Sequence, residues 1–218
     1  NWKHTFEKHD LGVLLGHELY YTNTSGTETA YKAFPDTNFG LNDISMATRD
    51  TWKSSLEENA LLSFFGRLNY TFNDRYLFTA TLRADGSSKF AEGNRWGYFP
   101  SAAAAWRVSE EGFWKDNAIG NVVNNFKLRV GYVTTANCII DNYMYATAYN
   151  ATVYPVGNQE TAALAPGSTV GNNNLKWEKT VSTNIGLDLG LSAYRITLTL
   201  VWYNKKLHYM LINVAIPT

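Results

Sequence analysis

Five segments of the chain alternate between apolar and polar side chains with a period of two. They are residues 61–72, 76–85, 124–134, 181–191 and 194–202. Counting every second residue of each segment from Leu62, Tyr76, Asn124, Val181 and Tyr194, 24 of 28 residues are apolar or aromatic. Of the 25 residues between them, only 5 are apolar. A β-strand places successive side chains on opposite faces of its sheet, so this pattern predicts strands between one apolar and one polar environment. Weaker forms of the pattern at 11–21, 98–108 and Trp2–Phe6 predict further strands.

The connections between these segments are alternately short and long. Short or compact connections are expected at 7–10, 73–75, 110–121 and 192–193, and longer ones at 23–52, 89–97 and 138–174. Successive connections of an up-and-down meander lie at opposite ends of the sheet, and outer-membrane β-barrels carry short turns at one end and long loops at the other. The sequence therefore predicts an all-β, antiparallel up-and-down meander of about seven or eight strands. It would be a partial segment of a large transmembrane β-barrel, with helix confined to short pieces such as 110–121.

Aromatic side chains, which make up 15% of the sequence, favour the membrane interpretation. The aromatic residues that flank the short turns and are expected on the apolar face are Tyr70, Phe72, Tyr76, Phe78 and Tyr194. Barrels place aromatic girdles at the membrane–water interface, and strands of about ten residues suit a tilted crossing of the bilayer. An antiparallel sheet with one solvated face alternates in the same way. A soluble β-sandwich or lectin-like carbohydrate-binding module therefore stays open as the alternative.

Charge and cysteine content argue against several other classes of protein. The chain has nineteen Lys and Arg and nineteen Asp and Glu, so it lacks the excess of basic residues that is typical of a nucleic-acid-binding protein. No apolar run is long enough for a transmembrane helix. The single cysteine, Cys138, excludes an internal disulfide, and the four histidines have no metal-ligand spacing. We find no catalytic constellation, so we expect no enzyme, no metal and no cofactor.

Several motifs resemble one family of barrels. They include ENALLSFFGRLNY at 58–70, DRYLFTATLRADGSSKF at 74–90, NRWGYFPS at 94–101, LRVGY at 128–132, NLKWEKT at 174–180 and NIGLD at 184–188. In this order they resemble the barrel of SusC/RagA-like TonB-linked (TonB-dependent) outer-membrane transporters. Val133 and Ala136 depart from this family's pattern at the start of the 138–174 loop.

The resemblance implies a large barrel with an N-terminal plug, a TonB-contacting segment and a SusD-like surface lipoprotein outside. Such proteins import oligosaccharides or peptides across the outer membrane of Bacteroidota-type Gram-negative bacteria. We expect residues 1–218 to be a single barrel segment in contact with outer-membrane lipid, without the plug, the TonB-contacting segment or the closing C-terminal strands. The loops at 23–52 and 138–174 would be extracellular, and TonB would act through the absent N-terminal part.

Two groups of residues are candidates for contact with substrate or with other parts of the transporter. Charged residues expected to face the lumen are Arg67, Arg83, Asp85, Arg107 and Arg129. Aromatic residues in the expected loops are Trp52, Tyr145, Tyr149 and Tyr154. Arginine pairs readily with carboxylates and aromatic rings stack on flat ligand surfaces, so both groups are candidates for ligand contact. The alternatives are that the charges are simply solvated in a wet lumen and that the aromatic rings pack the loops themselves.

Overall fold

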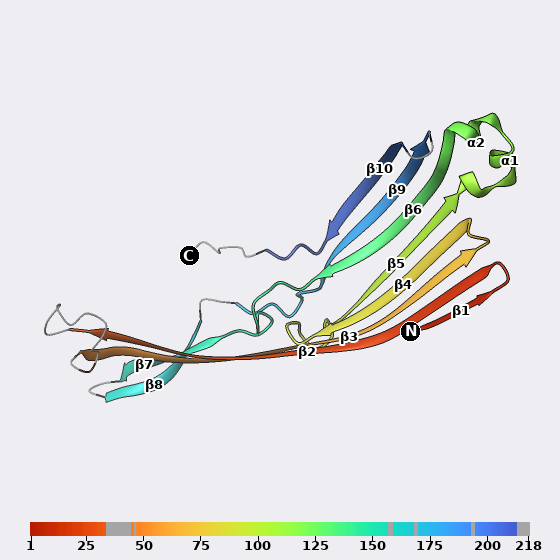
Figure 1. Cartoon of the computed structure of the whole chain (residues 1–218). Helices are drawn as coiled ribbons and strands as arrows, with labels where there is room; N and C mark the ends of the chain where they lie inside the picture. Colours follow the sequence, from red (N-terminus) through yellow and green to blue (C-terminus); the bar gives the residue numbers. More distant parts are fainter. Residues whose placement is uncertain (34–44, 46, 157–158, 168–169, 193–194, 213–218) are drawn as a thin grey trace.

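Eight strands form one continuous antiparallel sheet in the computed structural model (Figure 1), and two more form a separate hairpin. The structure describes residues 1–33, 45, 47–156, 159–167, 170–192 and 195–212. The sheet strands are β1 (Trp2–Phe6), β2 (His9–Lys32), β3 (Thr48–Phe72), β4 (Tyr76–Ser87), β5 (Trp96–Arg107), β6 (Val123–Asn137), β9 (Glu178–Leu191) and β10 (Ile196–His208), in that order. The hairpin consists of β7 (Tyr149–Val156) and β8 (Gln159–Pro166), inserted between β6 and β9. The predicted meander is confirmed.

Tight connections join neighbouring strands at one end of the sheet, as predicted. Asn73 and Asp74 have φ angles of 50° and 53°, a region that short polar residues tolerate, and they let β3 and β4 pair from Phe72 and Tyr76 onward. The wider connection from β5 to β6 holds the 3₁₀ helix η2 (Val108–Glu110), α1 (Gly112–Lys115) and α2 (Ala118–Val122). These are the short helical pieces expected near 110–121. Ala193 and Tyr194 lie outside the described residues.

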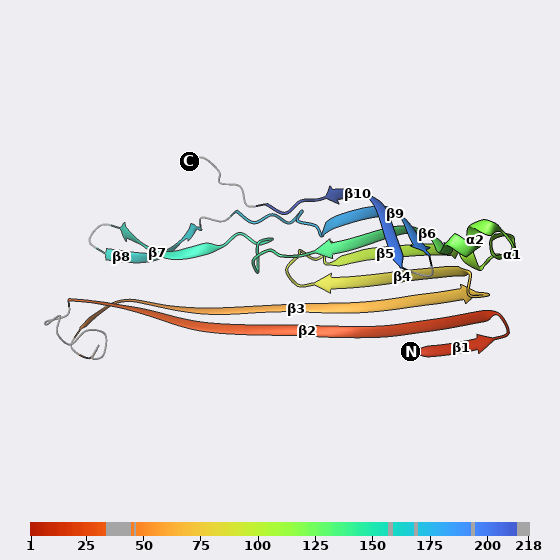
Figure 2. The same cartoon turned by 45° about the horizontal axis from the view of Figure 1, so that its top comes forward.

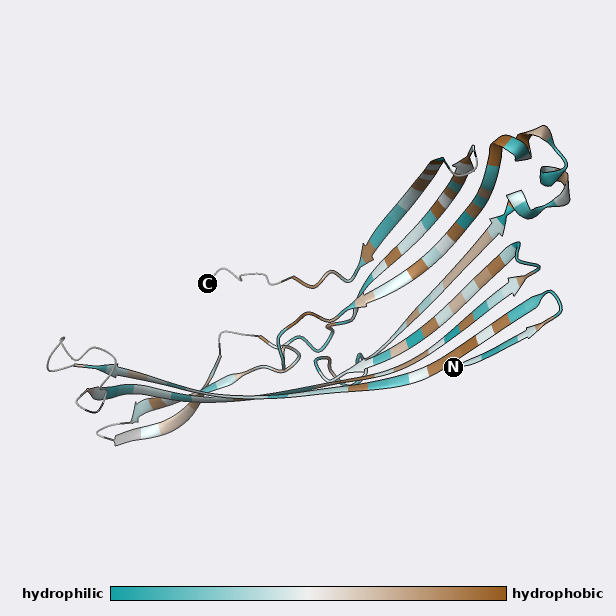
Figure 3. Cartoon of the chain, in the orientation of Figure 1, coloured by the Kyte–Doolittle hydropathy of each residue, from teal (hydrophilic) through white to brown (hydrophobic). Residues whose placement is uncertain are grey.

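The strand registers keep the apolar residues on one face. Leu68 pairs with Ala80, Ala80 with Ala102, and Ala102 with Tyr132, so one row crosses four strands. Bands of hydrophobic residues recur along these strands in Figure 3. Large apolar side chains on this face are open to the surroundings, as Trp202 is with 58% of its surface exposed. Such a surface needs an apolar environment, and no second sheet packs over it within the described ranges. This argues against the β-sandwich alternative.

An aromatic row follows the apolar face at the short-turn end. Its members, from β1 to β5, are Trp2, His4, Phe6, His9, Tyr70, Phe72, Phe78, Tyr76 and Trp106, and neighbouring ring centroids are 4.8–6.3 Å apart. The aromatic girdle expected around residues 73–75 is therefore present. Amphipathic rings are favoured at a membrane–water interface, so the row marks where this end of the sheet would leave the bilayer.

Most of the described residues in the segment 23–52, which was expected to be a loop, belong to β2 or β3, and this corrects the prediction for them. Residues 21–32 of β2 and 48–60 of β3 pair only with each other, because β4 begins to pair with β3 at Leu61. We call these two stretches the arm; at about 3.4 Å per residue they extend the sheet by roughly 40 Å (Figure 2). The arm is polar on both faces, so its sequence has no period-two signal. Residues 34–44 and 46 lie outside the described part of the chain.

The segment 138–174 also contains strand, since it includes the hairpin of β7 and β8. Before that hairpin, it contacts the arm: the Asn142 side-chain amide donates to Glu57 Oε2 at 3.0 Å, and the backbone N–H of Glu58 donates to the Tyr143 hydroxyl at 3.1 Å. Both predicted loops thus belong to one long-connection end, where β2 and β3 are held against the β6–β9 connection. Residues 157–158 and 168–169 are not among those described.

Candidate functional site

The polar face of the sheet holds Arg83 in a network that spans three strands. Arg83 Nε donates to both carboxylate oxygens of Asp85, at 2.7 and 2.9 Å, and Nη2 donates to Ser63 Oγ at 2.9 Å. Glu18 Oε2 of β2 lies 3.5 Å from Nη2, and the guanidinium lies 5.8 Å from the centroid of the Phe65 ring. Asp85 is buried while Arg83 is partly open, so the network fixes a cation that still faces the polar side. Two predicted site residues therefore come together here.

Arg129 forms the second network, nearer the short-turn end. Its Nε lies 2.8 Å from Asp188 Oδ2 and its Nη2 donates to Asp188 Oδ1 at 2.9 Å. Thr199 of β10 donates to the same carboxylate oxygen at 3.1 Å. A Cβ on Gly186 would lie 3.0 Å from Nη2, so the missing side chain makes room for the guanidinium to lie along the strand. The network ties β6, β9 and β10 together.

The other two predicted arginines stand apart from these networks. Arg67 Nε donates to Thr81 Oγ1 at 3.3 Å on the neighbouring strand. Arg107 is the last residue of β5, and its Nη1 donates to the Asp74 carbonyl at 3.3 Å in the β3–β4 turn. Arg107 therefore belongs to the short-turn rim of the sheet. Apart from the Arg83–Asp85 pair, the charged candidates lie at separate levels of the polar face.

The predicted loop aromatics are also dispersed. Trp52 lies on the arm, 66% exposed, with the Arg49 guanidinium 6.0 Å from its ring centroid. Tyr149 and Tyr154 are exposed on β7, where their odd spacing points them to opposite faces of the hairpin. Tyr145 lies in the preceding connection and is half-buried. Contact of these residues with a ligand stays a prediction.

The motif DGSSKF at 85–90 contributes to the packing of the loops at the long-connection end. Phe90, Phe99 and Trp177 are 0%, 3% and 5% exposed and form the buried core of the long-connection end, which we call the loop core. The Trp177 indole N–H donates to the Arg95 carbonyl at 2.9 Å, and Lys89 Nζ donates to the Ile140 carbonyl at 2.8 Å. Motifs far apart in the sequence thus meet to fold the connections against the sheet.

Cys138 packs beside the loop core. Burial is the main reason that the pKa of its thiol is raised. A thiol with a raised pKa forms little thiolate, and the thiolate is the reactive form. The residue therefore contributes packing to this end of the sheet.

Glu111 was not predicted as an important residue, yet it organises the short-turn rim. It accepts hydrogen bonds from the Tyr76 hydroxyl at 2.7 Å, Trp106 Nε1 at 3.1 Å and Arg75 Nη1 at 2.7 Å. These bonds, first from Tyr76 and then from Trp106, hold the pKa of the Glu111 carboxyl below its usual value. We call the four residues the rim cluster. The sequence signal was weak, because a glutamate next to a turn is usually solvated.

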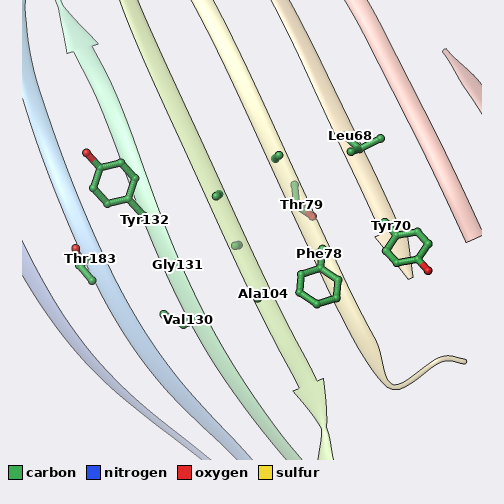
Figure 4. Close-up of a pocket in the computed structure, with 12 residues that line it drawn as sticks. Leu68, Tyr70, Phe78, Thr79, Ala104, Val130, Gly131, Tyr132 and Thr183 are labelled. Carbon is green, nitrogen blue, oxygen red and sulfur yellow. The ribbon is translucent and has the colours of Figure 1, made fainter. Parts of the chain in front are cut away.

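A shallow groove of about 400 Å³ lies on the apolar face, and Figure 4 shows its lining. Alanines of β4 and β5 form its floor, and Tyr70, Phe78, Val130 and Tyr132 stand around them. None of the predicted charged residues lines this groove. The groove therefore belongs to the surface that faces apolar surroundings, whereas Arg83 and Arg129 with their carboxylate partners lie on the other face.

The described residues hold no group of three or more His, Cys, Asp or Glu placed to bind a metal ion. In the same part of the chain, no helix is long and apolar enough to cross a membrane.

An apolar outer face, a charged inner face and unequal connections at the two ends together define a wall of an outer-membrane β-barrel. The family model described as "TonB dependent receptor-like, beta-barrel" matches residues 1–217, and the chain belongs to this family.

Among curated proteins, the chain is 38% identical over 218 residues to the TonB-dependent receptor SusC of Bacteroides thetaiotaomicron, covering 95% of this chain and 20% of that protein. It is 36% identical over 219 residues to the TonB-dependent receptor P26 of Formosa agariphila, covering 97% of this chain and 21% of the relative. The chain thus spans about a fifth of the length of these relatives.

A solved structure of the RagAB peptide transporter is also similar. The TM-score is 0.83 at 28% sequence identity, with 99% of this chain and 24% of the solved chain covered. The resemblance to SusC/RagA-like barrels inferred from the sequence motifs is confirmed.

Proposed function

We propose that this chain forms part of the barrel wall of an outer-membrane TonB-dependent importer of glycans or peptides, in a bacterium of the Bacteroidota type. The observation that carries the proposal is the division of the sheet into an open apolar face and a face of positioned charges. Similarity to SusC and to the RagAB peptide transporter supports import as the activity. The relatives do not decide between glycan and peptide, so both substrate classes belong to the proposal.

The polar face would line the lumen. Arg83 is held by the Asp85 carboxylate and the Ser63 hydroxyl, and Arg129 by the Asp188 carboxylate, so both guanidinium groups are oriented before any ligand arrives. Both side chains keep 39% of their surface open. A guanidinium held in this way offers its remaining N–H groups to carboxylates or hydroxyls of a passing substrate or of a plug. Arg67 lies on the same face, between these two levels, and would contribute a further polar contact, whereas Asp85 is buried and acts by holding Arg83.

The arm and the β7–β8 hairpin would lie outside the cell and meet a SusD-like surface lipoprotein. The arm reaches well beyond the strands that cross the membrane, and Asn142 and Tyr143 brace it. Exposed Trp52, Tyr149 and Tyr154 give this region apolar surface for a protein partner or for the faces of sugar rings. TonB would act through a part of the transporter that lies outside this chain.

Growth on defined substrates tests the import function. A strain that lacks the full-length transporter should fail to grow on one glycan or peptide mixture as sole carbon source, and the wild-type gene should restore growth. A transporter in which residues 24–57 are replaced by a two-residue Asn-Gly turn should reach the outer membrane but lose co-purification of the lipoprotein. Growth of the deletion strain at the wild-type rate on every glycan and peptide offered would contradict the proposal.

A further inference from the structure

Two basic residues lie opposite each other on the polar face near the short-turn end. Arg107 of β5 pairs directly with Lys127 of β6, and the adjacent pair, Trp106 and Leu128, belongs to the apolar face. Alternation therefore places Arg107 and Lys127 together on the polar face. Directly opposite residues of an antiparallel pair have Cβ atoms about 5 Å apart, and like charges in this position destabilise a sheet. An anion between these two side chains, which we call the basic pair, would relieve the repulsion.

The carboxylate that the register places beside the basic pair is already engaged. Asp188 of β9 pairs with Lys127, but its Oδ1 accepts hydrogen bonds from Arg129 Nη2 at 2.9 Å and from Thr199 Oγ1 at 3.1 Å. Its Oδ2 lies 2.8 Å from Arg129 Nε. Among the described residues, Lys127 forms no ion pair with a carboxylate. Asp188 therefore serves Arg129 and leaves the charge of Lys127 uncompensated.

The acidic residues of the β5–β6 connection do not neutralise Arg107 either. Glu110 forms an ion pair with Lys115 at 2.6 Å, and Glu111 forms one with Arg75 at 2.7 Å. In the part of the chain that the structure describes, Arg107 forms no ion pair. The basic pair thus offers two uncompensated positive charges.

The basic pair is oriented and accessible. Arg107 Nη1 donates to the Asp74 carbonyl at 3.3 Å, which directs the guanidinium without adding a negative charge. Ala103 and Ala105 precede Arg107 on the polar face of β5, so this strand places only methyl groups above it. Arg107 and Lys127 are both partly exposed. A guanidinium and an ammonium group side by side can bind the two oxygens of one carboxylate.

The charges of the polar face differ between the two ends of the sheet. A register row from Arg67 on β3 to Lys205 on β10 divides this face into two parts. In this row and toward the short turns, the charged strand residues on the polar face are Lys3, Arg67, Arg107, Lys127, Arg129 and Lys205 against Asp10 and Asp188. Between this row and the arm they are Arg83 against Glu18, Asp85 and Glu178. The face is therefore positive toward the short turns and negative toward the long connections.

From this arrangement we propose that Arg107 and Lys127 bind a carboxylate of the transported substrate, and that this substrate is an extended peptide whose C-terminus points to the short-turn end. The inference rests on the proposed function, in which the polar face lines the lumen, and it names the substrate class. A peptide carries an ammonium group and a carboxylate at opposite ends, as the divided face requires. A neutral glycan has no group for the basic pair, and a uniformly acidic polymer would be repelled at the long-connection end.

The spacing of the charges sets the length of such a peptide. Gly97, which pairs with Asp85, lies ten residues before Arg107 on β5. At about 3.4 Å per residue this is roughly 34 Å, so an extended peptide of about ten residues reaches from the acidic part of the face to the basic pair.

Retention of a synthetic peptide library by the purified full-length transporter in detergent tests the site. The library contains ten-residue peptides with uncharged side chains, each present as the C-terminal acid and as the C-terminal amide, and mass spectrometry measures the ratio of the two forms retained. The wild type should retain the acid about fivefold better than the amide, as expected for partly exposed charge pairs. The double substitution R107Q/K127Q should lower this ratio to about one. A ratio of one in the wild type would mean that the transporter's own carboxylates occupy the basic pair, and would overturn the proposal.

Lys206 provides the matched control, because alternation along β10 places it on the apolar face. K206Q removes one positive charge, as K127Q does, but should keep the fivefold ratio, whereas K127Q should lower it to about twofold. Since Lys127 forms no ion pair, K127Q should unfold thermally as the wild type does and so reports on binding alone. Equal ratios in K127Q and K206Q would contradict the assignment.

Acetylation of the peptide N-terminus tests the direction. The wild type should prefer the free amine, and E18Q, a change at the acidic part of the face, should reduce this preference and leave the acid-to-amide ratio unchanged. R107Q/K127Q should show the opposite pattern; an equal change of both preferences in this variant would overturn the orientation. Growth on a glycan at the wild-type rate by a transporter that retains no peptide would overturn the peptide assignment and leave the import proposal intact.

Discussion

The two ends of the sheet are built in different ways. At the short-turn end, Glu111 joins the β3–β4 turn, β4 and β5 through three hydrogen bonds, and an aromatic row surrounds them. At the long-connection end, loops fold around Phe90, Phe99 and Trp177, while the arm continues outward as two strands alone. The hydrogen bonds of Glu111 span at most 36 residues of sequence, whereas the loop core joins Phe90 to Trp177, 87 residues apart.

The largest effect is expected at the loop core. Trp177→Ala removes a buried ring and its hydrogen bond to Arg95, so the long-connection end should lose about 3–5 kcal/mol of stability. Hydrogen exchange in the full-length transporter should show new exposure in residues 88–95 and 138–148, with the rim unchanged. Trp202→Ala on the apolar face is the matched control and should leave those loops protected. Loss of protection at both ends would show that the two ends fold as one unit.

The next effect concerns the rim cluster and its pH dependence. The pKa of Glu111 is lower in the folded protein than in the unfolded chain, so its contribution to stability is present above the unfolded value of about 4.3. That contribution is lost as pH falls through the folded value. Heat-modifiable migration on gels should therefore show the wild type losing stability in acid, with a weaker pH dependence in Glu111→Gln. Glu110→Gln, an exposed neighbour, should behave as the wild type, and equal profiles for all three proteins would refute this role.

A smaller effect is expected from the charge pair on the polar face. Arg129 and Asp188 are both partly solvated, so a double-mutant cycle with Arg129→Gln and Asp188→Asn should give a coupling of about 1 kcal/mol or less. Thermal unfolding of the full-length transporter in detergent gives the four stabilities. If these variants reduce the rate of import although their thermal stability is nearly that of the wild type, Arg129 contacts the substrate or the plug. If import falls only in variants that are also less stable, the role of Arg129 is to stabilise the barrel wall.

The smallest effect on stability is expected in the arm. Trp52→Ala changes an exposed side chain and should alter unfolding by less than about 0.5 kcal/mol. The same variant should reduce co-purification of the surface lipoprotein if the arm meets it. A stability loss comparable to that of Trp177→Ala would mean that the arm is part of the loop core.

The sheet itself was predictable from the sequence. Period-two alternation located β3, β4, β6, β9 and β10 because each has one apolar and one polar side, and the 73–75 turn fixed the β3–β4 register. The charged candidates Arg83 and Arg129 were placed on the polar face for the same reason. Local pattern suffices for these features because neighbouring residues on one strand decide them.

Only the tertiary structure decided the features that depend on distant segments. The arm is polar on both faces, so nothing local distinguishes its strands from a loop, and pairing between β2 and β3 alone defines it. Glu111 gains its three donors only when the β3–β4 turn meets the β5–β6 connection, and Trp177 meets Phe90 only after the meander has folded. The alternation of apolar and polar residues predicts on which face of the sheet a side chain lies. How deeply that side chain is buried, and which residues it contacts, depends on strands and loops that backbone hydrogen bonds bring together from distant parts of the sequence.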